Sequence, residues 1–222
     1  MDKAICLVSG GMDSAVTLAI ALRDFEVHAM HVMYGQRTQE RELQSFRELV
    51  EYYGIEQTLI ISMDYIQRIG ASSLTDREIE VPMRVGDKGI IPNTYVPFRN
   101  AQILSAGVAW AEAVGASKVF IGAVEEDSSG YPDCRESFFK AFNDAVSKGT
   151  RPDTKIEIVT PVIHLSKTQI VKKGLELKVP FELTWSCYKN IDKACGECES
   201  CQLRLNAFRG AGIEDPISYE LK

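Results

Sequence analysis

The sequence predicts an α/β protein built on an open, doubly wound, mainly parallel five-stranded sheet, with a small C-terminal helical lobe. Short apolar runs alternate with segments of helical periodicity as far as about residue 160, and this alternation is typical of parallel strands joined by helices. The chain of 222 residues, 45% of them hydrophobic, suits one large domain with an appendage. Four of its six cysteines crowd a stretch near the C-terminus. We therefore expect the sheet domain to span residues 1–180, and the lobe with a terminal helix to span residues 181–222.

The predicted elements follow one another with little interruption. Strands are expected at residues 3–8, 26–33, 57–62, 118–124 and 155–160. Helices are expected at residues 14–22, 38–54, 98–115, 136–148, 168–177 and 202–210. Ser166 is a favourable N-cap for the fifth of these helices. Residues 63–96 lack a clear period, which is typical of a functional flap, although a surface insertion without function is the simpler alternative.

Composition and charge limit the partners. The net charge is −6 and no run of Lys and Arg is present, so no direct contact with nucleic acid is expected. No apolar run is long enough to span a bilayer, and the first strand begins at once, without the basic region of a signal peptide. We therefore expect a cytoplasmic protein with no membrane partner. His28 and His31 fall on opposite faces of their predicted strand, so they cannot form a joint site.

The turn between the first strand and the first helix carries the strongest local motif, Ser-Gly-Gly-Met-Asp-Ser at residues 9–14. Two adjacent glycines let backbone N–H groups converge, and the following helix N-terminus adds free N–H groups and a partial positive charge. The turn predicts a phosphate site, the alternative being a tight turn only. It has neither the Gly-Lys-Ser/Thr ending of a Walker loop nor a dinucleotide-binding glycine pattern. It resembles the pyrophosphate loop of the ATP pyrophosphatase family, whose members cleave ATP between the α- and β-phosphates to adenylylate a substrate.

Polar residues also follow the other predicted strands, at the sheet edge where ligands of open parallel sheets bind, although loops are commonly polar. If the ligand is ATP, Mg²⁺ is expected at Asp13, because a carboxylate beside phosphates needs a cation between them. Arg37, Arg99 and Lys167 are candidates to neutralise charge on the leaving pyrophosphate. Contacts to ATP are expected from Leu7, Val8, Ser9, Gly10, Gly11, Met12, Asp13 and Ser14.

The cysteines near the C-terminus have the spacing of a metal site. Cys195, Cys198 and Cys201 follow one another at intervals of three residues, and Cys187 lies upstream. Cys-x-x-Cys spacing lets two sulfurs reach one tetrahedral ion, and four thiolates close its coordination shell. One structural zinc per chain is therefore expected. An iron–sulfur cluster is the alternative, although the fourth cysteine of the usual cluster motif lies downstream rather than upstream.

Five stretches together resemble one family along nearly the whole chain. They are Ser9-Gly10-Gly11-Met12-Asp13-Ser14, Tyr34-Gly35-Gln36-Arg37, Pro97-Phe98-Arg99-Asn100, Asp127-Ser128-Ser129-Gly130-Tyr131-Pro132-Asp133-Cys134-Arg135 and the four clustered cysteines. In this combination they are similar to the 7-cyano-7-deazaguanine synthases of the queuosine precursor pathway. The resemblance implies ATP-dependent conversion of 7-carboxy-7-deazaguanine and ammonia to the nitrile, through an adenylylated acid and an adenylylated amide.

The same resemblance implies small-molecule partners, free ammonia as the nitrogen donor and a homodimer. Groups that read the deazaguanine are expected among Tyr34, Phe98, Arg99, Asn100, Glu125, Asp127, Tyr131, Asp133 and Arg135. Two alternatives stay open. A tRNA-modifying relative such as a thiolase would use the cysteines for a cluster or to carry sulfur, whereas a nucleotide-binding module would turn over no ATP.

Overall fold

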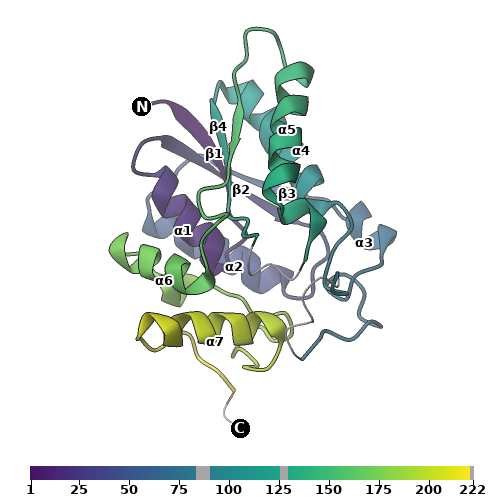
Figure 1. The fold of residues 1–222 in the computed structure, drawn as a ribbon, viewed down its shortest axis with the longest axis vertical. Helices are drawn as coiled ribbons and strands as arrows, with labels where there is room; N and C mark the ends of the chain where they lie inside the picture. The colour runs from purple at the N-terminus through teal and green to yellow at the C-terminus, as the bar shows by residue number, and fades with distance from the viewer. Residues whose placement is uncertain (84–90, 126–129, 221–222) are drawn as a thin grey trace.

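The computed structural model describes residues 1–83, 91–125 and 130–220, and a five-stranded sheet forms its centre (Figure 1). The strand order is β3-β2-β1-β4-β5, and every neighbouring pair is parallel. The strands are β1 (Lys3–Leu7), β2 (Glu26–Met33), β3 (Thr58–Ser62), β4 (Lys118–Ile121) and β5 (Glu157–Val159). The predicted parallel sheet is therefore confirmed, and the direction of strand addition reverses between β1 and β4.

The predicted helices occur in the expected order, and the one predicted at residues 136–148 begins at the expected residue, whereas the other predicted helices begin one to three residues earlier or later. The helices are α1 (Met12–Ala21), α2 (Gln39–Tyr52), α3 (Tyr65–Ile69), α4 (Arg99–Val114), α5 (Glu136–Gly149), α6 (Lys167–Glu176) and α7 (Glu199–Ala211), with 3₁₀ turns at Pro132–Cys134 and Phe181–Leu183. Helix α1 begins two residues earlier than predicted because Gly11, in extended conformation, is its N-cap. The predicted cap of α6 is confirmed, since Ser166 and Gln169 form a reciprocal capping box. Helix α3 lies in the region without a predicted element.

Helices cover both faces of the sheet (Figure 1). One hydrophobic cluster joins β1 to α1, α2, α6 and α7, and a second joins β1 and β4 to α4 and α5. Successive side chains of β1 alternate between the two clusters, as expected for a strand covered on both sides. The two histidines of β2 follow the same rule: His31 stacks on Phe46 of α2, whereas His28 contacts Trp110 of α4. Their predicted separation onto opposite faces is confirmed.

The C-terminal segment packs directly on the sheet domain. Helix α7 lies against α6 (Figure 1), and its Phe208 belongs to the same hydrophobic cluster as α1. A third cluster gathers the four clustered cysteines with Trp185 and Ile217. The backbone N–H of Trp185 donates to the carbonyl oxygen of Gly10 at 2.9 Å, which joins this segment to the predicted phosphate turn. None of the helices in the described part of the chain has the length and apolar character needed to cross a membrane.

Candidate active site

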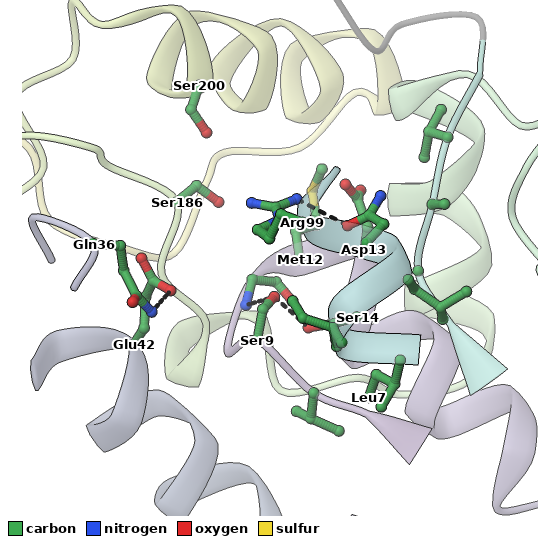
Figure 2. A pocket seen from close by; sticks show the side chains of 18 of the residues that line it. Leu7, Ser9, Met12, Asp13, Ser14, Gln36, Glu42, Arg99, Ser186 and Ser200 are labelled. Atoms are coloured by element: carbon green, nitrogen blue, oxygen red, sulfur yellow. Dashed lines mark hydrogen bonds between the residues drawn. The ribbon is translucent and has the colours of Figure 1, made fainter. Parts of the chain in front are cut away.

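A cavity of about 290 Å³ opens at the carboxyl ends of β1, β2 and β4, where the direction of strand addition reverses (Figure 2). Ligands of open parallel sheets bind at this position. We call this cavity the cleft and residues 9–14 the phosphate loop. The predicted site residues that line the cleft are Leu7, Val8, Ser9, Gly11, Met12, Asp13, Ser14, Tyr34, Arg99, Asn100, Tyr131 and Lys167. The fold thus brings together the ends of three strands and the starts of α1, α4 and α6.

Close backbone approaches hold the phosphate loop on two sides. Gly10 has a φ of +88°, and a Cβ at this residue would lie 2.6 Å from the carbonyl oxygen of Glu42. On the side of β4, a Cβ on Gly122 would lie 2.9 Å from backbone atoms of Asp13 and Ser14. Glycine is therefore required at both positions. Because the loop runs directly into α1, free N–H groups of the first helical turn are available to an anion in the cleft.

Asp13 and Lys167 form an ion pair at the edge of the phosphate loop. Lys167 Nζ donates to Asp13 Oδ2 at 2.5 Å. The other carboxylate oxygen, Oδ1, is buried and has no hydrogen-bond partner among the described residues. Leaving a buried acceptor without a partner is costly, so Asp13 Oδ1 is a candidate ligand for a cation. Oxygen ligands of this kind are the ones that Mg²⁺ prefers, and Asp13 therefore fits a magnesium ion beside bound phosphates.

Arg99, at the first turn of α4, is a partly buried cation that makes no ion pair within the described chain. Its Nη1 donates to Tyr34 Oη at 3.0 Å and its Nη2 to Asn100 Oδ1 at 3.1 Å, while Nε is buried without a partner. Burial alone would lower the pKa of Arg99, but the phenol of Tyr34, the thiol of Cys134 and the carboxylate of Asp133 together raise it above its usual value. Arg99 is therefore charged, and it is suited to an anion in the cleft.

Arg37, a candidate from the sequence, does not line the cleft and instead ties a loop distant in sequence to the end of β2. Its Nε donates to the carbonyl oxygen of Ser73 at 2.6 Å, and its Nη2 donates to those of Asp76 and Ile79 at 2.8 and 2.6 Å. These carbonyls belong to the region for which the sequence predicted no element. Arg37 thus orders part of that region.

Two acidic residues that the sequence suggested for substrate binding instead accept hydrogen bonds from backbone N–H groups at the starts of helices. Asp133 Oδ2 accepts from the backbone N–H of Asn100 at 2.9 Å, at the start of α4. Glu125 Oε2 accepts from the backbone N–H of Glu136 at 3.2 Å, at the start of α5. Neither is among the residues that line the cleft, and the same holds for Gly10, Phe98 and Arg135. Asp127 lies outside the described residues.

The four cysteines near the C-terminus converge as a metal site requires. The sulfur atoms of Cys187, Cys195, Cys198 and Cys201 all lie within 4.8 Å of one another. Cys187 Sγ accepts three backbone N–H groups, and Cys195 Sγ accepts two. Hydrogen bonds with the thiols of Cys198 and Cys201 lower the pKa of Cys187. Thiolates supported by N–H groups fit zinc and an iron–sulfur cluster alike, so the cluster is consistent with a bound metal.

Comparison with known proteins assigns the chain to a family. The model of the family described as queuosine biosynthesis protein QueC matches residues 3–212. The chain belongs to this family. A 7-cyano-7-deazaguanine synthase of Chlorobium chlorochromatii (strain CaD3) is 58% identical over 221 residues, which cover 99% of this chain and 97% of that protein. One from Chloroherpeton thalassium (strain ATCC 35110 / GB-78) is 55% identical over 99% of this chain and 98% of its own length.

The QueC family resemblance predicted from the sequence motifs is therefore confirmed. The chain is an enzyme of queuosine biosynthesis and has 7-cyano-7-deazaguanine synthase activity. Among solved structures, the predicted subunit of tRNA methyltransferase from Methanocaldococcus jannaschii is 12% identical, covers 99% of this chain and 93% of its own, and has a TM-score of 0.51. At this identity the likeness concerns the fold alone.

Several QueC cleft residues were missed from the sequence. Ser186 and Ser200 point their hydroxyl groups into the cleft (Figure 2), and Glu42 and Arg204 also line it. Ser186 and Ser200 lie in the predicted zinc segment, which hid their position in the wall of the cleft. Arg204 did leave a signal, because a charged residue three positions after Cys201 and three before Ala207 falls on the buried face of α7.

Proposed function

We propose that the cleft performs the QueC reaction by adenylylating its substrate twice with ATP. A carboxylate oxygen of 7-carboxy-7-deazaguanine attacks the α-phosphorus, and the bond from that phosphorus to pyrophosphate breaks. Ammonia displaces AMP and gives the amide. The amide oxygen attacks the α-phosphorus of a second ATP, which releases a second pyrophosphate, and loss of AMP and two protons leaves the nitrile. One cleft suits both halves of the reaction because the same problem arises twice. In each half the oxygen of an acid or of an amide is a poor leaving group, and transfer of AMP to that oxygen makes it a good one.

The observation that carries this proposal is the convergence of anion-binding groups on one cavity. Backbone N–H groups of the phosphate loop, the ammonium group of Lys167 and the guanidinium of Arg99 come from three elements and line the same cleft. Arg99 has no counter-ion within the described chain and a free Nε. We assign Arg99 and Lys167 to the charge that develops on pyrophosphate. We assign Mg²⁺ to Asp13, where the bound ion would neutralise phosphate charge.

The deazaguanine is assigned to the aromatic and amide side chains of the same cleft. Tyr34, Asn100 and Tyr131 line it, and they offer a phenol ring, an amide and a second phenol to a planar heterocycle. Arg37 is assigned to ordering the loop around residues 73–79 rather than to phosphate. Hydrogen bonds to the edges of a heterocycle reject analogues that lack those edges.

For the C-terminal residues 181–222 we propose a metal-stabilised appendage that completes the wall of the cleft. Four thiolates would close the coordination shell of one zinc ion, which leaves no open position for catalysis. The appendage would be a distinct segment of the sequence but not a separate folding unit, since α7 and α1 share one hydrophobic cluster. We further propose a homodimer, which light scattering of the purified protein tests directly.

The decisive experiment supplies purified protein with Mg-ATP, ammonium ion and 7-carboxy-7-deazaguanine and identifies the products by mass spectrometry. Nitrile together with AMP and pyrophosphate is the expected result. ADP and phosphate in place of AMP and pyrophosphate would refute the adenylylation steps. Metal analysis of the same sample distinguishes one zinc per chain from iron and sulfide, and added tRNA should leave the rate unchanged.

A further inference from the structure

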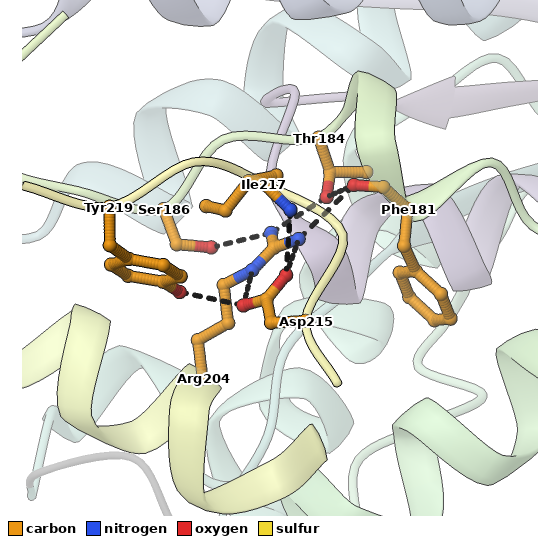
Figure 3. Close-up of polar contacts among 7 residues, drawn as sticks. All are labelled: Phe181, Thr184, Ser186, Arg204, Asp215, Ile217 and Tyr219. Carbon is orange, nitrogen blue, oxygen red and sulfur yellow. Dashed lines mark hydrogen bonds and ion pairs between the residues drawn. The ribbon is translucent and has the colours of Figure 1, made fainter. Parts of the chain in front are cut away.

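Arg204 of α7 is a buried guanidinium whose five N–H groups are all used (Figure 3). Nε and Nη2 bind the two carboxylate oxygens of Asp215 at 2.7 and 3.0 Å. The remaining donors bind Thr184 Oγ1 at 2.7 Å, Ser186 Oγ at 3.3 Å and the carbonyl oxygen of Phe181 at 3.1 Å. A bidentate pair of this kind fixes the orientation of the guanidinium plane. Arg204 therefore holds the chain after α7 and residues 181–186 in one arrangement.

Asp215 is itself fixed by the C-terminal tail. Tyr219 Oη donates to Asp215 Oδ2 at 2.6 Å, and the backbone N–H of Ile217 donates to Oδ1 at 3.3 Å (Figure 3). The tail is tied in turn to the cysteine segment, because Ala194 donates its N–H to Ser218 and accepts the N–H of Glu220, each at 2.9 Å. The tail is thus held beside the segment that carries the clustered cysteines.

The other end of the network reaches the phosphate loop. Trp185, between the two hydroxyl residues that Arg204 binds, donates its N–H to the carbonyl oxygen of Gly10 at 2.9 Å. Its own carbonyl oxygen lies 3.6 Å from the position that a Cβ on Gly11 would occupy. Ser186 follows and points into the cleft (Figure 2). Since Arg204 donates to Ser186 Oγ, the hydroxyl hydrogen of Ser186 is left to donate elsewhere, and the structure shows no hydrogen bond from it to another described residue.

We propose that Ser186 donates a hydrogen bond to a phosphate of the nucleotide at the phosphate loop, and that Arg204 and Asp215 are positioning residues that hold its hydroxyl group there. This inference rests on the proposed function, since it needs the nucleotide phosphates at residues 9–14. It gives the C-terminal tail a part in nucleotide binding, although no tail residue that the structure describes lines the cleft.

The Ser186 contact is tested by measuring the Kd of Mg-ATP by calorimetry and the KM values of ATP and 7-carboxy-7-deazaguanine. For Ser186→Ala we expect the Kd and KM of ATP to rise about tenfold or more, because a hydrogen bond to a charged group is lost. The KM of the deazaguanine should change by less than about twofold. Ser186→Thr, which keeps the hydroxyl group, should restore most of the affinity. An unchanged Kd for ATP, or a rise confined to the KM of the deazaguanine, would overturn the contact.

The positioning role is tested with Arg204→Lys and, as the milder change, Tyr219→Phe, which removes one hydrogen bond from Asp215. Both should raise the Kd of ATP, Tyr219→Phe by the smaller factor. In a double-mutant cycle, Arg204→Lys should weaken ATP binding less in the Ser186→Ala background than in the wild type, because it acts through the same hydroxyl group. Full additivity, or an unchanged Kd in folded Tyr219→Phe and Arg204→Lys proteins, would refute positioning.

Val146→Ala is the matched control for general loss of stability. Val146 is buried in the core between α5 and the sheet, away from the network. It should lower the melting temperature and leave the Kd of ATP unchanged. The wild-type product analysis separates the two proposals: wild-type protein that binds Mg-ATP but forms no AMP contradicts the proposed reaction, whereas the Kd series still decides the role of Ser186.

Discussion

Replacing Arg99 by methionine should separate ligand binding from stability. In the free protein Arg99 donates to Tyr34 and Asn100 at 3.0 and 3.1 Å, and losing these two hydrogen bonds costs about 1 kcal/mol each. Burial disfavours the charge of Arg99, but Tyr34, Cys134 and Asp133 favour it more strongly, so removing the charge brings no net gain in stability. We therefore expect the free energy of unfolding of the free Arg99→Met protein to fall by about 2 kcal/mol.

The nucleotide complex should lose more. One charge-assisted hydrogen bond contributes about 1.5–3 kcal/mol, which corresponds to a loss of about 10- to 100-fold in affinity for Mg-ATP. At a nucleotide concentration of about 100 times the wild-type Kd, binding stabilises the wild type by about 2.7 kcal/mol, and a variant weakened about 100-fold by only about 0.4 kcal/mol. For a chain of this length a wild-type shift of about 5–10 °C in Tm should shrink to about 1–2 °C.

Thermal unfolding with and without Mg-ATP measures these shifts, and AMP release measures turnover. Arg151→Met is the control, because Arg151 is exposed and its ion pair with Glu112, at 3.5 Å, lies on the surface. It should keep both the shift and the turnover. An Arg99→Met protein that keeps the full thermal shift and the wild-type kcat/KM would refute the assignment of Arg99 to an anion.

Three further predictions concern single positions. Gly122→Ala should lower the free energy of unfolding by about 1–3 kcal/mol and slow turnover, because its Cβ would press on the phosphate loop. Gly149→Ala is the control and should do neither, because the space around Gly149 is open. Equal melting temperatures for the two variants would contradict this prediction. Cys198→Ser should reduce bound metal below one per chain by elemental analysis and lower Tm, and full metal content would argue against a four-cysteine site. Burial raises the pKa of Cys134 to about 11, so its thiol is protonated at pH 8. Labelling with iodoacetamide, followed by mass spectrometry, should therefore be slow at pH 8 and become faster as the pH rises. Rapid labelling at pH 7 would instead show that Cys134 is a thiolate.

The parts of the fold that could be predicted depend on signals that are local in the sequence. The apolar runs of the strands, the glycine pair after β1 and the Ser166 cap each act within a few residues, and all three are found where predicted. The cysteine cluster belongs to the same class, because Cys-x-x-Cys spacing brings sulfurs together by short turns. The position of the cleft could also be predicted from the sequence, since the loops at the carboxyl ends of parallel strands meet at one edge of the sheet.

The parts that could not be predicted depend on long-range contacts. Arg37 binds carbonyl oxygens 36 to 42 residues further along the chain, in a region whose sequence has no period. Asp133 accepts the N–H of Asn100, which lies 33 residues earlier. An arginine or an aspartate near a strand end gives the same sequence pattern whether its side chain faces a ligand or a backbone group. The partner decides the role, and only the fold supplies the partner.

Arg99 and Arg204 show how partners separate these roles in one molecule. Both line the cleft, and both are held by surrounding protein. Arg204 uses all five donors and pairs with a carboxylate that is 2% exposed, so a ligand would have to displace an existing partner to reach it. Arg99 pairs with no carboxylate in the described chain and keeps a buried donor free. Binding of an anion therefore improves the environment of Arg99 and can only disrupt that of Arg204, which is why we assign the first to the reaction and the second to the wall that supports it.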